Sequence, residues 1–415
     1  MSYILFCLEI ILLLIGMYYL SISLFSLTTA KKRSVSDKLH SYALIVAAHN
    51  EERVIAGLLN SLAQMYYPAH KYKVFVVADN CTDSTADIAR AHGATVLERF
   101  SETEKGKGYA LEHAFAHIFE NDDNYDYIAV FDADNTVAPD FLTRMNETVN
   151  QGYRAVQGYL DSKNPYDSWV TFSYSLWYWL NNRSAQLSRG NLGIGCRLGG
   201  TGLAIETQLI KEYGWGATCL AEDTEFTLKL ALNDIKVGWS QDAVVYDEKP
   251  IKMEASWNQR TRWVQGLADV GTRFIRPLLK KGLTEKKAEP IHMVMNFWSD
   301  TLVPICLSVF AALDIFTWIS LATNGEFLPI LTGVWMQPMN FLLLNIYLLG
   351  TLFVAVFGLY QDKKLSVGLL KHMGGFILYL LSWIPIGIVG CLKKNNKEWY
   401  HTPHVVNGDS SRKES

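Results

Sequence analysis

The chain of 415 residues is long enough for two or three structural units. Its 38 lysine and arginine residues nearly balance its 41 aspartate and glutamate residues, which argues against a broad basic face that binds nucleic acid. The six cysteines form no C-x-x-C pair, so the sequence predicts neither a zinc site nor a disulfide framework and suits a reducing compartment.

The first predicted element is a transmembrane helix within residues 1–30. Residues 2–27 are apolar apart from Glu9, and they are long enough to cross the ~30 Å hydrocarbon layer, which needs ~20 helical residues. No basic n-region precedes this run and no small-residue cleavage pattern follows it, which favours a retained anchor over a removed signal peptide. The basic residues at 31–33 place the next segment in the cytoplasm by the positive-inside tendency.

Residues 40–250 are predicted to form a cytoplasmic, doubly wound α/β domain. Short apolar runs alternate with helix-period segments, which is typical of a mostly parallel sheet with helices on its faces. Helix candidates open at Glu51, Asp83, Gly108 and Pro139. The expected strands are Tyr42–Ala48, Tyr72–Ala78, Ala94–Glu98, Tyr127–Phe131 and Arg154–Tyr159.

An aromatic stripe over residues 166–189 predicts a further helix, packed on the sheet or at the membrane interface. The alternative is a platform on which sugars stack.

The C-terminal part is predicted to consist of interfacial helices at 251–290, transmembrane or interfacial helices at 291–392 and a cytoplasmic tail at 393–415. The last region contains three apolar runs long enough to span a bilayer, but three crossings would leave the basic tail outside the cell. We therefore expect two full crossings, with the third run, 365–392, re-entrant or lying along the interface.

Acidic side chains follow three of the predicted strands. Glu51 and Glu52 come after the first, Asp79 after the second, and Asp132 and Asp134 after the buried run that ends at position 131. Because ligands of a parallel sheet bind beyond the carboxyl ends of its strands, these carboxylates are expected to meet there and to need a countercharge. Mg2+ or Mn2+ would supply it, sharing one or two carboxylates with substrate phosphates. A D-x-D pair alone is also what an ordinary acidic turn produces, and its place directly after a buried strand favours function.

Two further segments carry candidate chemistry. In "AEDTEF" one of Glu222 and Asp223 is explained by a helix N-terminus, which favours acids, whereas the other could take the proton from an acceptor hydroxyl. In "WNQRTRWVQG" the spacing puts Gln259, Arg262 and Trp263 on one helix face, where arginine can bind a diphosphate and tryptophan can stack on a sugar ring. A basic interfacial helix is the alternative for this second segment.

Lys107, beside glycines at a helix start, is a candidate phosphate contact, although such lysines are usually solvated.

The motifs "VAAHNEE", "VVADNCTDST", "GKGYAL", "FDADN", "GGTGLAI", "AEDTEF" and "QRTRW" occur in the order found in membrane-embedded family 2 glycosyltransferases, the group of cellulose, chitin and hyaluronan synthases. The chain resembles that family over residues 40–265. The resemblance implies a GT-A type fold, a UDP-sugar donor and Mg2+ or Mn2+. It assigns Ala48, His49 and Glu51 to the nucleotide, Asp79 to the uracil, Lys107 and Asp132 to the diphosphate, Asp134 to the metal, Asp223 to the general base, and Gln259, Arg262 and Trp263 to the diphosphate and acceptor.

Two departures from the family pattern bear on function. Ala47 stands where the first motif often has proline. The segment "EWYHTPH" at 398–404 resembles a loop that closes over the nucleotide in the polysaccharide synthases, but little chain follows it and the membrane segments are fewer than in the larger synthases. The sequence thus predicts an inverting, multi-pass enzyme of the cell membrane that extends a polysaccharide. An alternative is transfer of one sugar to a lipid such as diacylglycerol, ceramide or a polyprenyl phosphate. A non-catalytic transporter or nucleotide sensor, suggested by Asp300 and Asp314, is the alternative from another class.

Overall fold

The computed structural model describes residues 2–29, 37–121, 124–217, 219–299, 318–319, 322–323, 338–366 and 368–394. Several sequence predictions lie outside these residues: the basic cluster at 31–33, the acids Asp300 and Asp314, and the "EWYHTPH" segment.

A single eight-stranded sheet forms the centre of the molecule, in the order β3-β2-β1-β4-β7-β6-β8-β5. The first four strands pair in parallel with one another (β1 with β2, β1 with β4 and β2 with β3), and β6 pairs in parallel with β8. Strand β7 is antiparallel to both β4 and β6, so β6 and β8 again point in the direction of β4. The bounds are β1 Tyr42–Ala48, β2 Tyr72–Asp79, β3 Thr95–Arg99, β4 Tyr127–Asp132, β5 Thr136–Val137, β6 Ala155–Ser162, β7 Leu203–Glu206 and β8 Val237–Asp247.

Both faces of the sheet are buried, which explains why the strands read as continuous apolar runs. Alternate residues of β1 point to opposite sides: Ile45 joins a core with helices α4 and α6, whereas Leu44 and Val46 join a core with α2 and α5. The doubly wound, mostly parallel architecture predicted from the sequence is therefore confirmed.

Twelve numbered α-helices are described, and the three longest, α10, α12 and α13, lie in the C-terminal part of the chain. Their bounds are α1 Ser2–Ser23, α2 Ile55–Ala63, α3 Thr85–Ala91, α4 Lys107–Glu120, α5 Phe141–Val149, α6 Trp169–Asn181, α7 Ser188–Leu192, α8 Thr207–Tyr213, α9 Glu222–Leu232, α10 Met253–Thr284, α12 Pro338–Gln361 and α13 Gly368–Leu392. A further helical segment covers 288–299.

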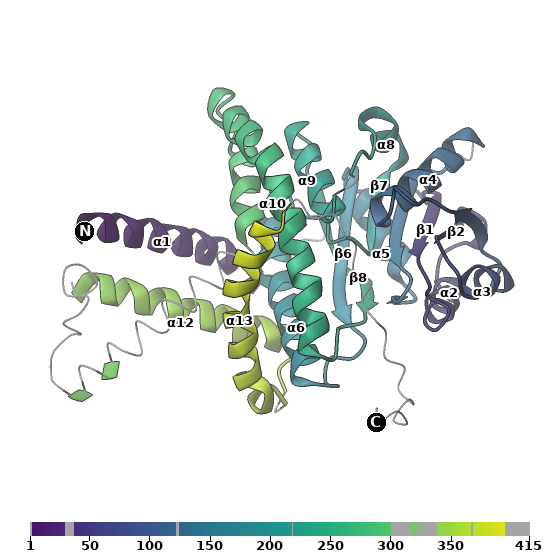
Figure 1. Ribbon diagram of the computed structural model, residues 1–415. Helices are drawn as coiled ribbons and strands as arrows, with labels where there is room; N and C mark the ends of the chain where they lie inside the picture. Colours follow the sequence, from purple (N-terminus) through teal and green to yellow (C-terminus); the bar gives the residue numbers. More distant parts are fainter. Residues whose placement is uncertain are drawn as a thin grey trace.

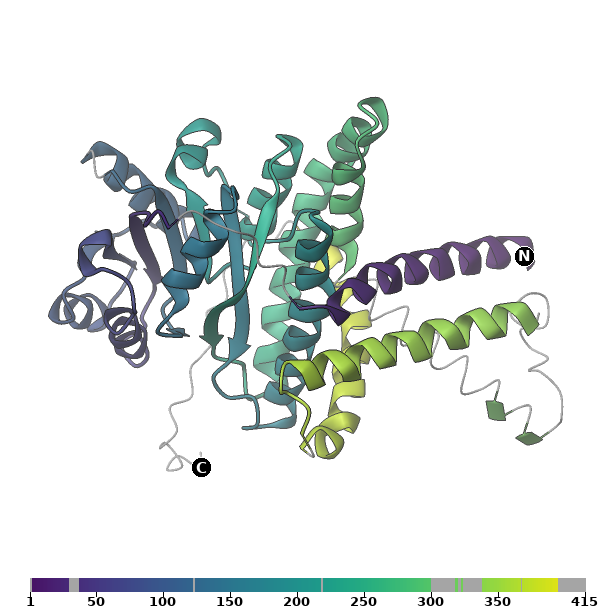
Figure 2. The same ribbon diagram turned by 180° about the vertical axis from the view of Figure 1, so that it is seen from behind.

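Helices α1 and α12 leave the domain side by side, while α10 and α13 run across their base (Figures 1 and 2). Glycines allow the first pair to approach closely: a Cβ at Gly16 would lie 3.0 Å from the Tyr347 ring, and one at Gly350 would lie 3.0 Å from Leu20. Among the described residues, one helical stretch, Lys371–Leu392, is long and apolar enough to cross a membrane.

The aromatic stripe forms helix α6, as predicted. Its N-terminus is closed by a capping box in which the Ser168 hydroxyl accepts from the Thr171 N–H, 3.1 Å away. The buried Phe172 and Trp179 pack on the sheet, and Tyr174 packs against α10 and α13. This face of α6 is therefore covered by protein.

The five predicted strands are confirmed within two or three residues at either end, but β5, β7 and β8 were missed. Strand β7 is only four residues long, and polar Ser240, Gln241 and Asp242 interrupt the apolar pattern of β8. The segment 368–392 is one continuous helix through Pro385, so the structure shows no re-entrant turn there.

Candidate functional site

The carboxyl ends of β2, β4, β6 and β8 gather at one edge of the sheet. Three of these strands bring an acid to this edge, since Asp79 closes β2, Asp132 closes β4 and Asp247 closes β8. Asp161, next to last in β6, pairs instead with Lys364. The parallel register places Ser162 opposite Asp247. This edge is where a sheet of this topology binds ligands.

Lys107, at the start of α4, is the charged centre of the site. Its ammonium forms an ion pair with Asp132 and donates a hydrogen bond to the Gly200 carbonyl, 2.7 Å away. Burial lowers the pKa of Lys107, but the charges of Asp132, Glu222 and Asp223 outweigh burial and raise that pKa overall. The resemblance assigned both residues to the diphosphate, and the structure places them in contact with each other.

Glu222 and Asp223 begin helix α9 and face Lys107. Burial, followed by the charge of Asp223, raises the pKa of Glu222 to about 7. Burial also raises the pKa of Asp223, against the hydrogen bond from the Thr224 N–H at 2.6 Å and the charges of Arg197 and Lys107. Both acids thus hold protons more tightly than free carboxylates, and the pKa of Glu222 lies near neutral pH.

Two glycines let these elements approach. Gly200 has a φ of +81°, and a Cβ there would lie 3.5 Å from the Asp223 carboxylate and 3.9 Å from the Lys107 ammonium. Gly266, on α10, touches the residue before α9: a Cβ there would lie 2.7 Å from both the backbone nitrogen and the Cβ of Ala221. Helix α10 and the acid pair are therefore in direct contact.

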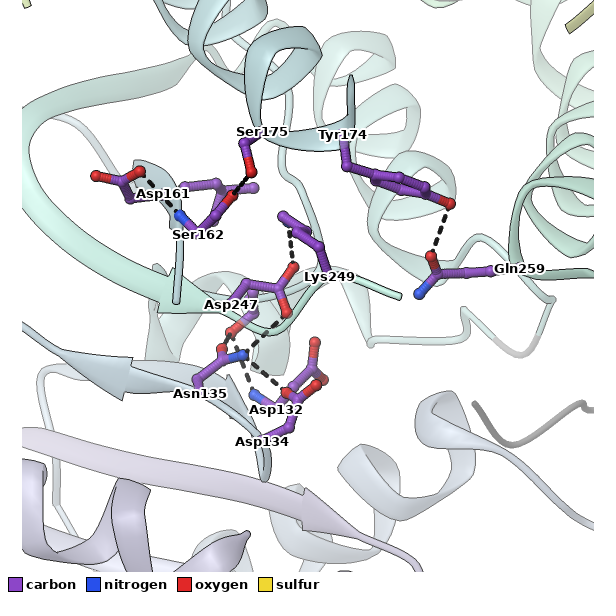
Figure 3. Close-up of polar contacts among 12 residues, drawn as sticks. Asp132, Asp134, Asn135, Asp161, Ser162, Tyr174, Ser175, Asp247, Lys249 and Gln259 are labelled. Carbon is purple, nitrogen blue, oxygen red and sulfur yellow. Dashed lines mark hydrogen bonds and ion pairs between the residues drawn. The ribbon is translucent and has the colours of Figure 1, made fainter. Parts of the chain in front are cut away.

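The D-x-D loop is held by residues from three other segments (Figure 3). The Asn135 amide donates to Asp134 at 2.8 Å and to Asp247 at 3.4 Å, and the Thr201 hydroxyl accepts from the Asp132 N–H at 3.1 Å. Lys163 donates to the Asp134 carbonyl.

Within the described residues, no group of three or more histidines, cysteines or acids is arranged to enclose a metal ion. The oxygen donors of Asp132 and Asp134 nevertheless fit a hard divalent cation that takes its other ligands from a diphosphate.

The side chains of α10 predicted to meet diphosphate and acceptor lie along one stretch of that helix. Gln259 accepts a hydrogen bond from the Tyr174 hydroxyl at 2.9 Å, and the Trp263 ring packs edge-on against the same tyrosine, 6.1 Å between centroids. The positive charge of Arg262 acts to lower the pKa of Glu222. The buried Nε of Arg262 has no hydrogen-bond partner within the described part of the chain. An unsatisfied guanidinium nitrogen beside the acid pair fits an anionic ligand such as a diphosphate.

Arg260, between these residues, turns away from the site. It is fully buried, donates to the Ser382 hydroxyl at 2.8 Å and lies 4.2 Å from the Tyr379 ring centroid. The cation–π contact fastens α10 to α13.

The predicted nucleotide residues lie at the ends of β1 and β2. The His49 ring nitrogen Nδ1 is 2.7 Å from the Asp79 carbonyl, and the Asp79 carboxylate pairs with buried Arg99 at 2.7 Å. Ala48 ends β1 opposite Ala78, and the Glu51 N–H donates to the Thr85 hydroxyl at 2.8 Å. The structure brings these residues together as one group, and Lys107, Asp132 and Asp223 as another, both along the same sheet edge.

Sequence reasoning missed several residues of this site, namely Asn135, Thr201, Asp247 and Lys249. Asp247 follows the apolar run "AVVY", the same signal that marked Asp79 and Asp132. Thr201 and Asn135 carried no such signal because they act by hydrogen bonds between distant segments.

Comparison with known proteins identifies the family of the chain. The family described as "Glycosyltransferase like family 2" matches residues 40–266, more than half of the chain. The probable glycosyltransferase YdaM of Bacillus subtilis is 29% identical over 266 residues, which cover 60% of this chain and 60% of that protein. A beta-monoglucosyldiacylglycerol synthase of Nostoc sp. is 25% identical over 400 residues, 91% of this chain and 79% of that protein. A poly-beta-1,6-N-acetyl-D-glucosamine synthase of Staphylococcus epidermidis is 24% identical over 283 residues, 66% of this chain and 65% of that protein.

Among solved structures, a mannosyltransferase from Pyrobaculum calidifontis in complex with GDP-Man and Mn2+ superposes with a TM-score of 0.57. The match has 18% identity and covers 93% of this chain and 97% of that one. This likeness confirms the GT-A type fold.

Proposed function

The chain belongs to glycosyltransferase family 2, and on that premise we propose that it transfers a sugar from a UDP-sugar to an acceptor hydroxyl at the membrane surface, with inversion. The observation that carries the proposal is the meeting of Lys107, Asp132 and the Glu222–Asp223 pair around the Gly200 carbonyl. This arrangement combines cationic and acidic groups at the edge where the donor would bind.

In the proposed reaction, the Asp223 carboxylate takes the proton of the acceptor hydroxyl while that oxygen attacks the anomeric carbon. The bond between this carbon and the diphosphate oxygen breaks, and UDP leaves with the electron pair. A single displacement of this kind turns an α-linked donor into a β-linked product.

Charge grows on the departing diphosphate, and Lys107 and Arg262 would bind it. Asp132 and Asp134 would hold Mg2+ or Mn2+, which supplies further neutralisation of that charge when bound. Ala48, His49, Glu51 and Asp79 would receive the nucleoside, and Gln259 and Trp263 would border the acceptor.

Two acceptor classes are candidates. The match to the poly-N-acetylglucosamine synthase supports a growing polysaccharide, the main prediction from the sequence. The match to the monoglucosyldiacylglycerol synthase supports a lipid acceptor, and it extends over 400 residues into the C-terminal helices. The sequence-based alternative of a non-catalytic transporter or sensor would leave the acid pair and the D-x-D loop without a role.

We further propose that α1 and α12 cross the bilayer as parts of a multi-pass anchor, with the catalytic domain on the cytoplasmic side. Exposed apolar side chains support this, including Leu14 on α1 and Leu349 on α12, each 63% exposed. Helix α13 would lie along the interface, because it runs across the base of this pair (Figure 1) and carries exposed lysines, Lys371 and Lys393, at its two ends.

The test offers a panel of radiolabelled UDP-sugars to the purified protein with Mn2+ or Mg2+ and measures UDP release and product size. A long polymer identifies a polysaccharide synthase, and a single chloroform-soluble product identifies a lipid acceptor. Asp223→Asn is expected to lower the turnover by about 10²- to 10⁴-fold, as loss of a general base does, while UDP binding persists.

The matched control is Asp87→Asn, which changes an aspartate with a side chain that is 83% exposed on α3 and should leave turnover unchanged. Undiminished turnover by Asp223→Asn, or by Asp134→Ala, would contradict the assigned roles.

A further inference from the structure

A buried charge pair lies next to the D-x-D loop and takes no part in the chemistry described above. The Lys249 ammonium is 2.6 Å from Asp247 Oδ2 and 3.6 Å from the ring centroid of Tyr178 on α6. Lys249 is only 2% exposed, so its charge depends on this carboxylate and this aromatic face for compensation.

The second oxygen of Asp247 reaches the loop. Asp247 Oδ1 accepts from the Asn135 amide nitrogen, and the same nitrogen donates to Asp134 Oδ1. Asn135 is fully buried, and its own oxygen accepts from the Thr201 hydroxyl. A single amide group therefore orients the Asp134 carboxylate, and Asp247 helps fix that amide (Figure 3).

We propose that Asp247 is a positioning residue for the donor's cation, acting through Asn135 on Asp134, with Lys249 as its fixed countercharge. The inference rests on the proposed cation-dependent transfer. Outer partners of this kind orient metal-binding carboxylates, and their loss typically weakens metal binding 10- to 100-fold.

Helix α6 connects this pair to the other side of the site. The Tyr178 ring makes a cation–π contact with the Lys249 ammonium. Tyr174, one turn earlier, donates a hydrogen bond from its hydroxyl to Gln259 on α10. The same helix face thus supports both the loop that would hold the cation and the helix that would border the diphosphate.

The neighbouring strand offers a matched control. Asp161, near the end of β6, pairs with the Lys364 ammonium at 2.7 Å, which lies 4.9 Å from the Trp179 ring centroid. Its other carboxylate oxygen accepts from the Trp179 indole and the Ser162 N–H. This pair has the same acid, lysine and aromatic parts as the Asp247 pair, but these bonds lead away from the D-x-D loop.

The experiment measures Mn2+ binding to the full chain in detergent, in the presence of UDP, by electron paramagnetic resonance. Asp247→Asn alone would leave the Lys249 ammonium unpaired and could unfold the chain, so the main variant is Asp247→Asn with Lys249→Met. We expect this double variant to bind Mn2+ about tenfold more weakly. Asn135→Ser, which leaves the buried pair intact, should weaken Mn2+ binding by a similar factor.

The control, Asp161→Asn with Lys364→Met, should keep the Mn2+ affinity of the wild type even if its melting temperature falls. A folded Asp247→Asn, Lys249→Met variant with the Mn2+ affinity of the wild type would overturn this inference alone. A wild-type chain that takes up no Mn2+ beside UDP would overturn the proposed cation-dependent function and the inference with it.

Discussion

One ammonium group, that of Lys107, balances acids that come from two separate segments. Asp132 ends a strand, whereas Glu222 and Asp223 begin a helix about ninety positions later in the chain. Carboxylates gathered this closely would repel one another, and the repulsion appears in the raised pKa of Glu222, to which Asp223 contributes after burial. The carboxylates of the site therefore repel one another, and a bound cation or a proton taken from the acceptor would reduce this repulsion.

The raised pKa of Glu222 predicts a specific pH dependence of stability. Its ordinary value is 4.5 and its folded value is about 7, so the folded chain binds this proton more tightly than the unfolded chain does. The stabilisation is fully present below pH 4.5 and is lost as the pH rises through about 7. Glu222→Gln cannot lose a proton, and its melting temperature should therefore fall less than that of the wild type over this range.

Thermal unfolding of both proteins at several pH values checks this expectation. Glu102→Gln, an exposed glutamate in the loop after β3, serves as the control and should follow the wild type. If the melting temperatures of the wild type and Glu222→Gln change equally with pH, the pKa of Glu222 is not raised in the folded chain.

Helix α10 is the element that joins the candidate site to helix α13. It meets the start of α9 at Gly266, and it meets α13 through Arg260 and through Val264, which lies 2.6 Å from a Cβ built at Gly390. Because packed interiors do not deform continuously, a displacement of α13 would be transmitted through these contacts to the residues proposed to border the diphosphate.

Gly266→Ala is expected to impair catalysis by moving this helix. The new methyl group would lie 2.7 Å from the Ala221 backbone nitrogen, so α10 must shift away from the acid pair. A displacement of about 1 Å at a reacting centre costs about 10²-fold in rate. The measurement is turnover of the variant in membranes, with circular dichroism to confirm folding.

Gly387→Ala on α13 is the matched control, because no atom lies within 4 Å of a Cβ at that position. It should leave turnover unchanged. Equal turnover of both glycine variants would refute the role given to the contact between α10 and α9.

The long apolar helices of the molecule point in two different directions. Helices α1 and α12 project from the domain, whereas α13 runs across their base, although α13 contains the stretch that by length and composition could span a bilayer (Figure 2). Composition does not distinguish a spanning helix from one lying along the surface when both expose apolar side chains. Direction relative to the rest of the protein does.

Spin-label depth measurements should separate these two arrangements. Labels are placed singly at Leu349 on α12 and at Ile377, Leu381 and Ile388 on α13, in a chain with all six cysteines replaced by serine. We expect Leu349 to lie deep in the bilayer and the three α13 positions to share one shallow depth, judged by collision with oxygen and a water-soluble nickel complex. If α13 crosses the bilayer, its middle position will instead be the deepest of the three.

Short local patterns in the sequence were enough to predict the parallel half of the sheet, the acids at its strand ends and the family. Buried strands read as apolar runs, and ligand-binding acids follow them directly in the chain. Helix α6 was likewise predictable from its aromatic spacing.

Which distant groups meet became known only from the packing of the folded chain. The bonds from Asn135 to Asp247 and from Tyr174 to Gln259 join segments 112 and 85 positions apart, and no local pattern encodes them. The same holds for Arg260, which faces α13 while its neighbour Arg262 acts on the acid pair, because the direction of each side chain depends on what packs against the helix.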